Sequence, residues 1–366
     1  MKNFIINLPT LRRFDWLLFI LFSILFSIGL AAIYSVDLSR GTELNFFSTQ
    51  LTAAIIGVVI FFVVSLLHKS FFRSAAKLTY LFSILLLISV LIFGENIRGT
   101  RGWFQLFNFS FQPAELAKVG LILLSAWWIE KQGRRFDRWQ FILTSGFFTV
   151  LLAGLILLQP DMGSAIVLFM LWFCLLCLTG VKKRYLISLI LIFAVIATTG
   201  WFCVLQDYQK QRLITFINPQ HDPLGAGYNV RQSVIAIGAG QFWGRGLGFG
   251  SQSQLHFLPE AQTDFIFAVI AEELGFLGVA VLLTVYFLLL WRLLVVAQKT
   301  NSDFATFTVI GIILLFFIQI IINIGGATAF LPVTGVTLPF VSYGGSSLII
   351  NLLLLGIAES IVRSRT

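Results

Sequence analysis

The sequence predicts an all-α polytopic membrane protein with ten transmembrane helices. Of its 366 residues, 58% are hydrophobic and 11% are charged, whereas a soluble domain has about 25% charged residues. The mean hydropathy of +0.93 and the 39 Phe residues indicate that lipid is the solvent for most of the surface. Because the apolar excess comes in runs long enough to cross a bilayer, the composition excludes a soluble globular protein, a disordered chain and a coiled coil.

Ten apolar runs approach the length of about 20 residues that a bilayer requires. In chain order they cover residues 16–34, 47–67, 78–94, 114–130, 140–159, 163–180, 186–206, 264–291, 304–326 and 346–362. The longest polar interval, 207–263, falls between the seventh and eighth runs and predicts a large extracytoplasmic loop. We expect residues 1–366 to form one transmembrane domain, with this loop carrying part of any active site.

Lys and Arg residues predict the orientation of these spans. An even number of spans places both termini on one side of the membrane. The segments on that side carry seventeen Lys and Arg residues, and the segments on the other side carry seven. Since cytoplasmic loops of membrane proteins are enriched in Lys and Arg, both termini are predicted to be cytoplasmic.

The polar segments on the predicted outer side differ from the short basic connectors of the inner side. They cover residues 95–113, 207–263 and 327–345. Within the longest, Val230, Val234 and Ile237 recur at helical spacing, which favours a short helix lying on the outer membrane surface. Because long loops on a rigid scaffold tend to carry function, any chemistry is expected to face outward.

Ionisable residues within spans are costly and often mark functional sites. Glu115 and Lys118 open the fourth span three residues apart, on one helix face, so they are either functional or a structural ion pair. Asp161, in the outer turn after the fifth span, is either functional or a turn and cap residue. Glu272 and Glu273 either act in a site or hold neighbouring helices through hydrogen bonds.

Asp264 opens the eighth span. It follows Thr263, so it either caps the helix or serves as a functional carboxylate. Together these residues predict an outward-facing polar cavity lined by carboxylates and cations. Such a cavity suits a transporter, or an enzyme that acts on a membrane-embedded anionic substrate.

Three blocks of sequence resemble the SEDS family (shape, elongation, division and sporulation proteins) over nearly the whole chain. The first is FQPAE at 111–115, followed by Lys118. The second runs from DYQ at 207–209 through DPLGAGYN at 222–229 to TDFIFAV at 263–269 and AEELG at 271–275. The third joins LPVTGV at 331–336 to LPFVSYGGSS at 338–347.

Some positions depart from the family pattern or distinguish its branches. Ala114 replaces a usual Ser, Met162 replaces a Leu, Gly102 separates the usual Arg-Trp pair, and GGA at 325–327 differs from the common motif. Because of the departure at Gly102, the sequence does not decide which cations of the outer segment 95–113 contact the substrate. PVTGV at 332–336 and DYQKQR at 207–212 favour the cell-elongation branch over the division paralogue.

The resemblance implies a peptidoglycan glycosyltransferase in the bacterial plasma membrane. Such an enzyme polymerises lipid II, a lipid-pyrophosphate-linked sugar, into glycan strands with inversion at the anomeric centre. Inverting displacement by a sugar hydroxyl calls for a carboxylate base and for positive charge on the departing pyrophosphate. The resemblance assigns the base to Asp264 and places Glu115 and Lys118 at the cavity floor.

The resemblance also implies substrate-binding residues and partners. The expected substrate-binding residues are Arg98, Arg101, Trp103, Arg212, Arg231, Ser342 and Ser346. No cofactor is certain, although a divalent cation, Mg or Mn, would suit the pyrophosphate. Expected partners are lipid II, membrane lipids, a class B penicillin-binding protein acting as transpeptidase and other membrane proteins of the elongation complex. No nucleic acid is expected.

Three other functions stay open at this point. A division paralogue would carry out the same chemistry. A lipid II flippase would use a similar charged cavity, although no Gly/Pro-broken pair of spans at corresponding positions stands out in the two halves of the sequence. A non-catalytic scaffold for a penicillin-binding protein would not need Asp264. Polymerisation of lipid II by the purified protein separates the enzymes from the other two functions.

Overall fold

The computed structural model describes the chain from residue 14 to residue 364 with several gaps. The described residues are 14–39, 41, 44–97, 99–106, 109–133, 136, 139–203, 210, 214, 216 and 225–364. Most of residues 207–224, the first third of the predicted outer loop, therefore lie outside the described residues. Residues 225–263 of this loop are described.

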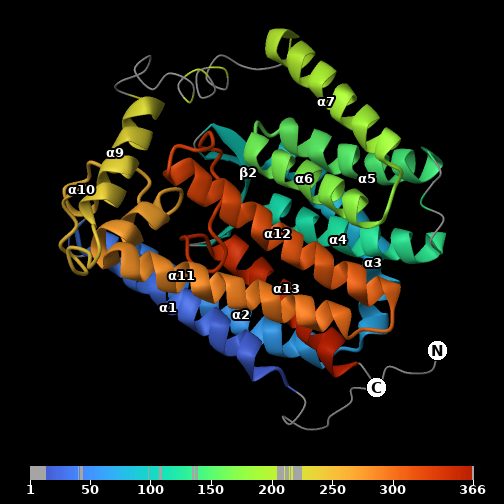
Figure 1. Ribbon diagram of the computed structural model, residues 1–366, viewed down its shortest axis with the longest axis horizontal. Coiled ribbons are helices and arrows are strands. Elements are labelled where there is room, and N and C mark those ends of the chain that lie inside the picture. Colours follow the sequence, from blue (N-terminus) through green and yellow to red (C-terminus); the bar gives the residue numbers. More distant parts are fainter. Residues whose placement is uncertain are drawn as a thin grey trace.

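Helices dominate the structure, and a helix overlaps each of the ten predicted runs (Figure 1). Those ten are α1 (Trp16–Ser39), α2 (Asn45–Leu66), α3 (Lys69–Phe93), α4 (Pro113–Gln132), α5 (Trp139–Leu157), α6 (Met162–Leu178), α7 (Lys183–Cys203), α11 (Ile266–Gln298), α12 (Asp303–Ala327) and α13 (Gly345–Arg363). Two more, α9 (Ala226–Ala239) and α10 (Ser251–Gln254), lie in the predicted outer loop. The helix expected around Val230, Val234 and Ile237 is thus confirmed.

Seven helices in the described part of the chain are long and apolar enough to cross a membrane: α1, α2, α3, α5, α11, α12 and α13. The apolar helix α6 is shorter, with 17 residues. The chain is therefore a multi-pass, mostly helical membrane protein. Crossing by α4, α6 and α7, which would complete the ten spans, stays a prediction.

A small antiparallel sheet corrects the all-α expectation. Strands β1 (Glu95–Ile97), β2 (Thr100–Leu106) and β3 (Phe109–Phe111) pair in that order within the segment predicted as a polar loop. Backbone N–H and C=O groups between two membrane helices need partners, and the ladder provides them over these few residues. β1 and β3 have three residues each, too few to show the alternation by which a strand is recognised in a sequence.

Hydrogen bonds fix which helix ends lie together. Asp15, just before α1, forms an ion pair of 2.7 Å with Arg292 near the end of α11. Its backbone N–H donates to Oε1 of Glu359 near the end of α13 (3.0 Å). The beginning of α1 and the end of α13 thus lie at one end of the bundle. This arrangement agrees with an even number of crossings, while the side that faces the cytoplasm stays a prediction.

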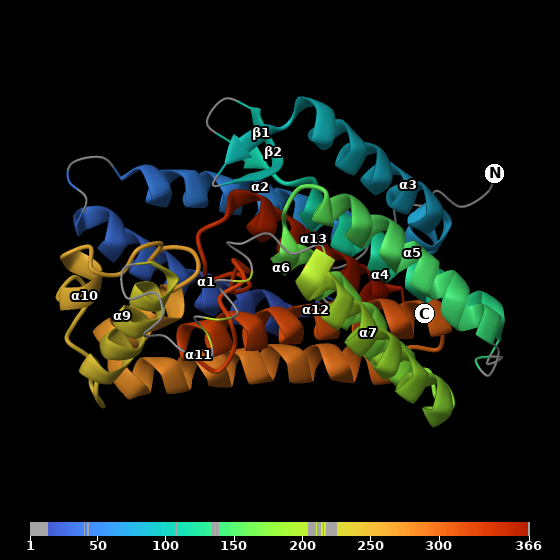
Figure 2. The same cartoon turned by 90° about the horizontal axis from the view of Figure 1, so that it is seen from above.

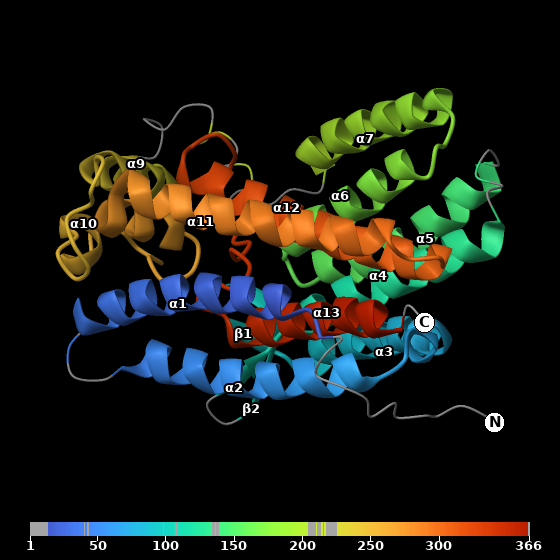
Figure 3. The ribbon, with the colours of Figure 1, turned by 60° about the horizontal axis from the view of Figure 1, so that its bottom comes forward.

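Small residues let the helices of the core approach closely. α13 packs along α2, where a Cβ on Gly57 would lie 2.5 Å from Leu352 and one on Gly356 would lie 2.9 Å from the carbonyl of Phe61. Without a hydrophobic effect in lipid, close backbone packing of this kind stabilises helix pairs. α1 and α2 flank one side of the bundle and α7 lies on the opposite side (Figures 1 and 3).

Helix α11 runs along α12 (Figure 2) and is broken at Gly275, where φ is 65° and ψ is −164°. The segment between α9 and α11 fills the break. The N–H groups of Arg245 and Gly246 donate to the carbonyls of Glu272 and Glu273 (3.0 and 2.9 Å), and Phe276 N donates to the carbonyl of Gln241 (2.8 Å). The backbone groups freed by the break are thereby satisfied, as a membrane helix requires.

Candidate functional site

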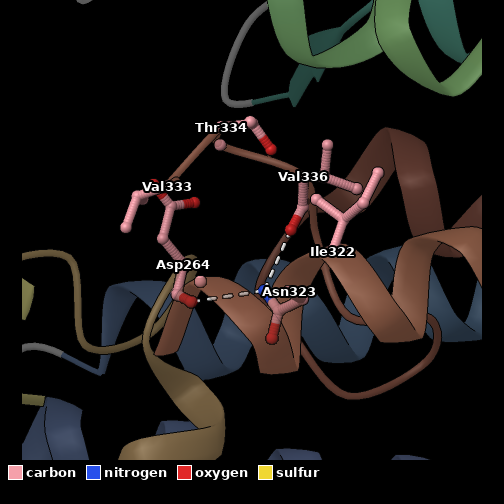
Figure 4. A pocket seen from close by; sticks show the side chains of 8 residues that line it. Asp264, Ile322, Asn323, Val333, Thr334 and Val336 are labelled. Carbon is pink, nitrogen blue, oxygen red and sulfur yellow. Dashed lines mark hydrogen bonds between the residues drawn. The ribbon is translucent and has the colours of Figure 1, made fainter. Parts of the chain in front are cut away.

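A small pocket contains Asp264, the residue that the sequence analysis singled out as the base. It is partly open, with about 180 Å³ of empty space when the adjoining solvent is included, and it is bounded by α12 and by the loop that leads to α13 (Figure 4). The lining residues are Asp264, Ile322, Asn323, Gly326, Val333, Thr334, Gly335 and Val336. Asp264 is half-buried. The pocket therefore holds a carboxylate beside both polar and apolar side chains.

Two side chains hold the backbone of Asp264 in place. Nδ2 of Asn323 donates to the carbonyl of Asp264 (3.2 Å) and to the carbonyl of Val336 (2.9 Å) (Figure 4). The hydroxyl of Ser342 donates to the carbonyl of Thr263 (2.7 Å) and accepts from the N–H of Leu338 (2.9 Å). The turn that carries Asp264 is thus joined to α12 and to the loop 328–344 at two consecutive carbonyls.

Asp264 does not occupy the capping position of the following helix. α11 begins at Ile266, and the N-cap residue is Phe265. The sequence had left helix capping as an alternative to a functional role. The carboxylate lies at the pocket, and its functional role stays a prediction.

Two further polar atoms line the pocket without a hydrogen-bond partner among the described residues. They are Oδ1 of Asn323 and Oγ1 of Thr334, and both are buried. Buried polar groups in proteins are almost always hydrogen-bonded, so such atoms indicate a place for water or ligand hydroxyl groups. Together with Asp264 they form a set of polar atoms suited to a polyhydroxylated ligand.

Glu115 and Lys118 form the ion pair that their spacing allowed. Nζ of Lys118 lies 2.7 Å from Oε1 of Glu115, and both side chains are almost fully buried in α4. Oε2 of Glu115 is buried without a hydrogen-bond partner among the described residues. Neither residue lines the Asp264 pocket, so their catalytic role stays a prediction.

The segment 342–346 connects the two groups of residues. Ser342 binds the turn before Asp264, as described above. The hydroxyl of Ser346 donates to the carbonyl of Ser110 (2.6 Å) and accepts from the N–H of Gln112 (3.2 Å), just before α4. The beginning of α4 and the turn of Asp264 are therefore held at the same end of the bundle.

Asp161 and the glutamates of α11 have structural partners. Asp161 caps α6, where its Oδ1 accepts from the N–H of Ser164 (2.9 Å), and its Oδ2 accepts from Nε2 of Gln112 (3.0 Å). Glu272 accepts from the N–H of Gln252 (2.8 Å) at the start of α10.

Glu273, the neighbour of Glu272, accepts from the hydroxyl of Ser35 in α1. The capping role of Asp161 and the role of the two glutamates in holding neighbouring elements are confirmed.

The predicted substrate-binding residues lie on different elements and differ in their exposure. Arg101 is exposed and donates to the carbonyls of Ile92, near the end of α3, and Gly94, just after it (3.0 and 3.1 Å). Trp103 lies half-buried on β2, and Arg231 is exposed on α9. Arg98 and Arg212 lie outside the described residues.

Ser342 and Ser346 are buried, and each donates its hydroxyl proton to a backbone carbonyl. Both hydroxyls therefore connect parts of the fold. A contact of either hydroxyl with substrate stays a prediction.

A resident metal would have few protein ligands. Within the described residues, no three His, Cys, Asp or Glu side chains gather at one point. Mg²⁺ commonly binds through one or two carboxylates together with substrate phosphates, and Asp264 provides one carboxylate. The cation stays a prediction.

Asn323 is the residue of this site that the sequence analysis missed. It lies within the ninth apolar run, and a polar amide inside an apolar span is a recognisable signal of hydrogen bonding across helices. Gln50 of α2 gives the same signal. Its amide donates to the carbonyl of Ser342 (3.2 Å) and accepts from the N–H of Gly344 (3.0 Å).

Comparisons with known proteins identify the family of the chain. Residues 11–366 match the model of a family described as "Cell cycle protein", which covers FtsW, RodA and SpoVE. The peptidoglycan glycosyltransferase MrdB of Escherichia coli K12 is 36% identical over 326 residues, which is 88% of this chain and 87% of that protein.

Two solved structures share the fold over nearly the whole chain. A chain of a peptidoglycan synthase complex that coordinates polymerization and crosslinking has a TM-score of 0.82 and 32% identity, with 97% of this chain and 99% of that one covered. The rod shape determining protein RodA of Thermus thermophilus has a TM-score of 0.73 and 30% identity, with 98% and 99% covered.

Proposed function

The chain belongs to the family of cell cycle proteins that includes FtsW, RodA and SpoVE, and from this premise we infer that it is a peptidoglycan glycosyltransferase. We propose that it works in cell elongation and polymerises lipid II into glycan strands with inversion. The observation that carries this proposal is a carboxylate, Asp264, in a pocket with buried unpartnered polar atoms at one end of a membrane-spanning bundle.

The proposed role of Asp264 is that of general base. An incoming sugar hydroxyl within hydrogen-bond reach of its carboxylate would lose its proton as the hydroxyl oxygen attacks the anomeric carbon. Asn323 binds the carbonyl of Asp264, and Ser342 binds that of Thr263. These hydrogen bonds hold the backbone that carries the carboxylate in place. Oδ1 of Asn323 and Oγ1 of Thr334 are available to orient the sugar.

Positive charge is needed on the opposite side of the reacting bond, where the pyrophosphate leaves. We assign this role to Lys118, held by Glu115, and to Arg98, Arg101, Arg212 and Arg231. Arg suits this task because its planar fork can bind two phosphate oxygens at once. Trp103 would stack on a sugar ring, and Ser342 and Ser346 would contribute hydrogen bonds. A divalent ion, Mg or Mn, would supply further positive charge to the pyrophosphate, and Asp264 is its candidate protein ligand.

The proposed setting is the bacterial plasma membrane, with both termini cytoplasmic and the Asp264 end facing outward. The excess of Lys and Arg on the side of the termini supports this orientation. A class B penicillin-binding protein is the proposed partner for crosslinking. It is supported by the likeness to a chain of a synthase complex that coordinates polymerization with crosslinking. Elongation-complex membrane proteins are further proposed partners.

A lipid flippase is the rival function, and one feature of the structure resembles carriers. Transporter folds often have a broken helix whose ends face a substrate, and α11 is broken at Gly275. Here the segment 241–246 occupies the break and binds its backbone groups. The break is therefore satisfied by the protein's own chain, which favours the enzyme over the carrier.

Substitution Asp264→Asn tests the proposed base. The amide is nearly isosteric and keeps the backbone carbonyl that Asn323 binds, but it cannot accept the hydroxyl proton. We expect a folded, normally abundant protein whose rate of lipid II polymerisation falls by about 10²–10⁴-fold. Purified protein, lipid II and gel separation of glycan chains by length provide the measurement.

The matched control is Asp303→Asn, the same change at an exposed position in the first turn of α12. It should retain wild-type polymerisation. Glycan product from Asp264→Asn at more than about a tenth of the wild-type rate would rule out the base assignment.

A further inference from the structure

A cluster of cations and indole rings lies at the other end of the bundle from Asp264, where α3 begins and α4 ends. The two helices approach closely, since a Cβ on Gly120 would lie 3.2 Å from Cα of Tyr80. Nζ of Lys77 lies 4.4 Å from the ring centroid of Trp127, and Nζ of Lys131 lies 5.3 Å from the same centroid. Two ammonium groups therefore share one indole.

The positive charge of these two lysines is not compensated by a carboxylate in the described part of the chain. The neighbouring acid, Glu130, forms an ion pair of 2.7 Å with Nε of Arg73. Lys77 and Lys131 are both exposed, and the ion pairs of the described residues do not include either of them. Two like charges at one ring repel each other, so an anion between or beside them would stabilise the arrangement.

The depth of Lys77 indicates where that anion lies. The apolar part of α3 that follows it, residues 78–93, extends about 24 Å at about 1.5 Å per residue, less than the roughly 30 Å of a bilayer's hydrocarbon core. With the end of α3 at one boundary of that core, the backbone of Lys77 lies about 6 Å inside the other, and its long side chain reaches the level of the lipid headgroups. Trp127, half-buried and five residues before the end of α4, is the residue type that prefers this level.

We propose that Lys77, Lys131 and Trp127 form a binding site for the phosphate of an anionic phospholipid at the end of the bundle where α1 begins and α13 ends. The two ammonium groups contact the phosphate oxygens. The indole provides an apolar surface for the glycerol and the first methylene groups. Basic pockets between membrane helices recognise anionic headgroups in this way. The site is separate from the Asp264 pocket and does not depend on the proposed catalytic function.

Native mass spectrometry of the full-length protein, titrated with phosphatidylglycerol, tests the site. We expect wild-type protein to hold one phosphatidylglycerol more tightly than any phosphatidylcholine. In the variant Lys77→Gln/Lys131→Gln the dissociation constant of that lipid should rise about 25-fold, which corresponds to about 1 kcal/mol for each lysine. Lys77→Arg, which keeps the charge, should stay within about threefold of wild type.

The matched control is Lys183→Gln/Lys299→Gln, which removes the same charge from two exposed lysines that make no cation–π contact with a described indole. This variant should bind phosphatidylglycerol like wild type. The proposal is overturned if the control loses as much affinity as the test variant, or if phosphatidylcholine binds equally well. It is also overturned if inorganic phosphate alone displaces the lipid at equal concentration. If the Lys77→Gln/Lys131→Gln variant does not fold, Lys131→Gln alone, at the exposed end of α4, must weaken binding about fivefold.

Discussion

Glu115 and Lys118 are two buried charges of α4, 5% and 2% exposed. Their ion pair of 2.7 Å is closed within α4 itself, so it forms as soon as the helix does. Breaking a buried pair by removing one partner usually costs about 3–5 kcal/mol, because the remaining charge stays buried. A catalytic and a structural role for Lys118 therefore both predict damage from a single substitution.

The substitution Lys118→Met, tested together with Glu115→Gln, separates the two roles. We expect Lys118→Met to abolish polymerisation while the protein remains in the membrane. In the double variant Lys118→Met/Glu115→Gln no charge is left unpaired, so its thermal stability should recover while polymerisation stays absent. Detergent-solubilised thermal unfolding and the glycan assay are the two measurements. Recovery of polymerisation in the double variant would reduce the pair to a structural role.

Ser342, before α13, and Ser346, in the first turn of α13, illustrate how one residue type holds parts of the fold together. Ser342 and Ser346 are both 3% exposed. Each hydroxyl donates to one backbone carbonyl and accepts from one backbone N–H. Backbone groups near a loop inside a membrane bundle need such partners, because water is not available to them. The segment that shapes the Asp264 pocket is thereby held in a single arrangement.

At the scale of elements, the break in α11 places the outer loop. Without it, a helix of 33 residues would extend about 50 Å, well beyond the bilayer. The left-handed φ of Gly275 turns the chain, and the segment 241–246 pairs with both sides of the break. Glu272 caps α10 from the last turn before the break. The break thus anchors the described part of the outer loop to a spanning helix.

Substitution Gly275→Ala should destabilise the protein strongly. Only glycine adopts this backbone conformation readily, and a Cβ would lie 2.2 Å from the N atom of Gly244 and 2.7 Å from the carbonyl of Phe242. We expect a loss of about 3 kcal/mol or more in unfolding free energy, visible as a lower thermal midpoint in detergent.

The control for this change is Gly154→Ala in α5, where a Cβ meets no atom within 4 Å. That variant should unfold at the wild-type temperature or slightly above it, since Ala is the better helix former. An unchanged midpoint for Gly275→Ala would show that the outer loop can leave the break at little cost.

At the scale of the whole molecule, the ends of the bundle have separate chemistry. One end carries the carboxylate pocket, the sheet and α9, whose Ser233 donates to the carbonyl of Ala327 at the end of α12 (2.6 Å). The other end carries the ion pair of Asp15 with Arg292 and the cluster of Lys77, Lys131 and Trp127. A membrane between them fits both the apolar surface of the helices and the distribution of charge.

Cysteine-accessibility labelling tests this orientation in intact cells. In a variant whose natural residues Cys174, Cys177 and Cys203 are replaced, a cysteine at the exposed position Gln241 should react with a membrane-impermeant reagent from outside. A cysteine at exposed Asn301, or within 131–139, should react only after the membrane is opened. Labelling of residues 207–263 from the cytoplasmic side alone would contradict an outward-facing site.

The sequence by itself determined the helical membrane class, the approximate range of each apolar helix and the family. A run of apolar residues indicates that lipid surrounds the helix. The backbone hydrogen bonds of a helix form between residues four apart in the chain. Both the membrane class and the helices can therefore be recognised without knowing any contact between distant residues. The same local logic gave the ion pair of Glu115 with Lys118 and the cap at Asp161 as one of two alternatives each, and the structure contains both contacts.

Only the tertiary structure decided how the candidate site is held together. Ser342 and Thr263 are 79 residues apart, Asn323 and Asp264 are 59 apart, and Ser346 and Ser110 are 236 apart. The break at Gly275, the sheet of β1–β3 and the two lysines on Trp127 depend in the same way on neighbours from other segments. Composition and spacing describe what a residue can bind, whereas its actual partner depends on which backbone groups folding leaves beside it.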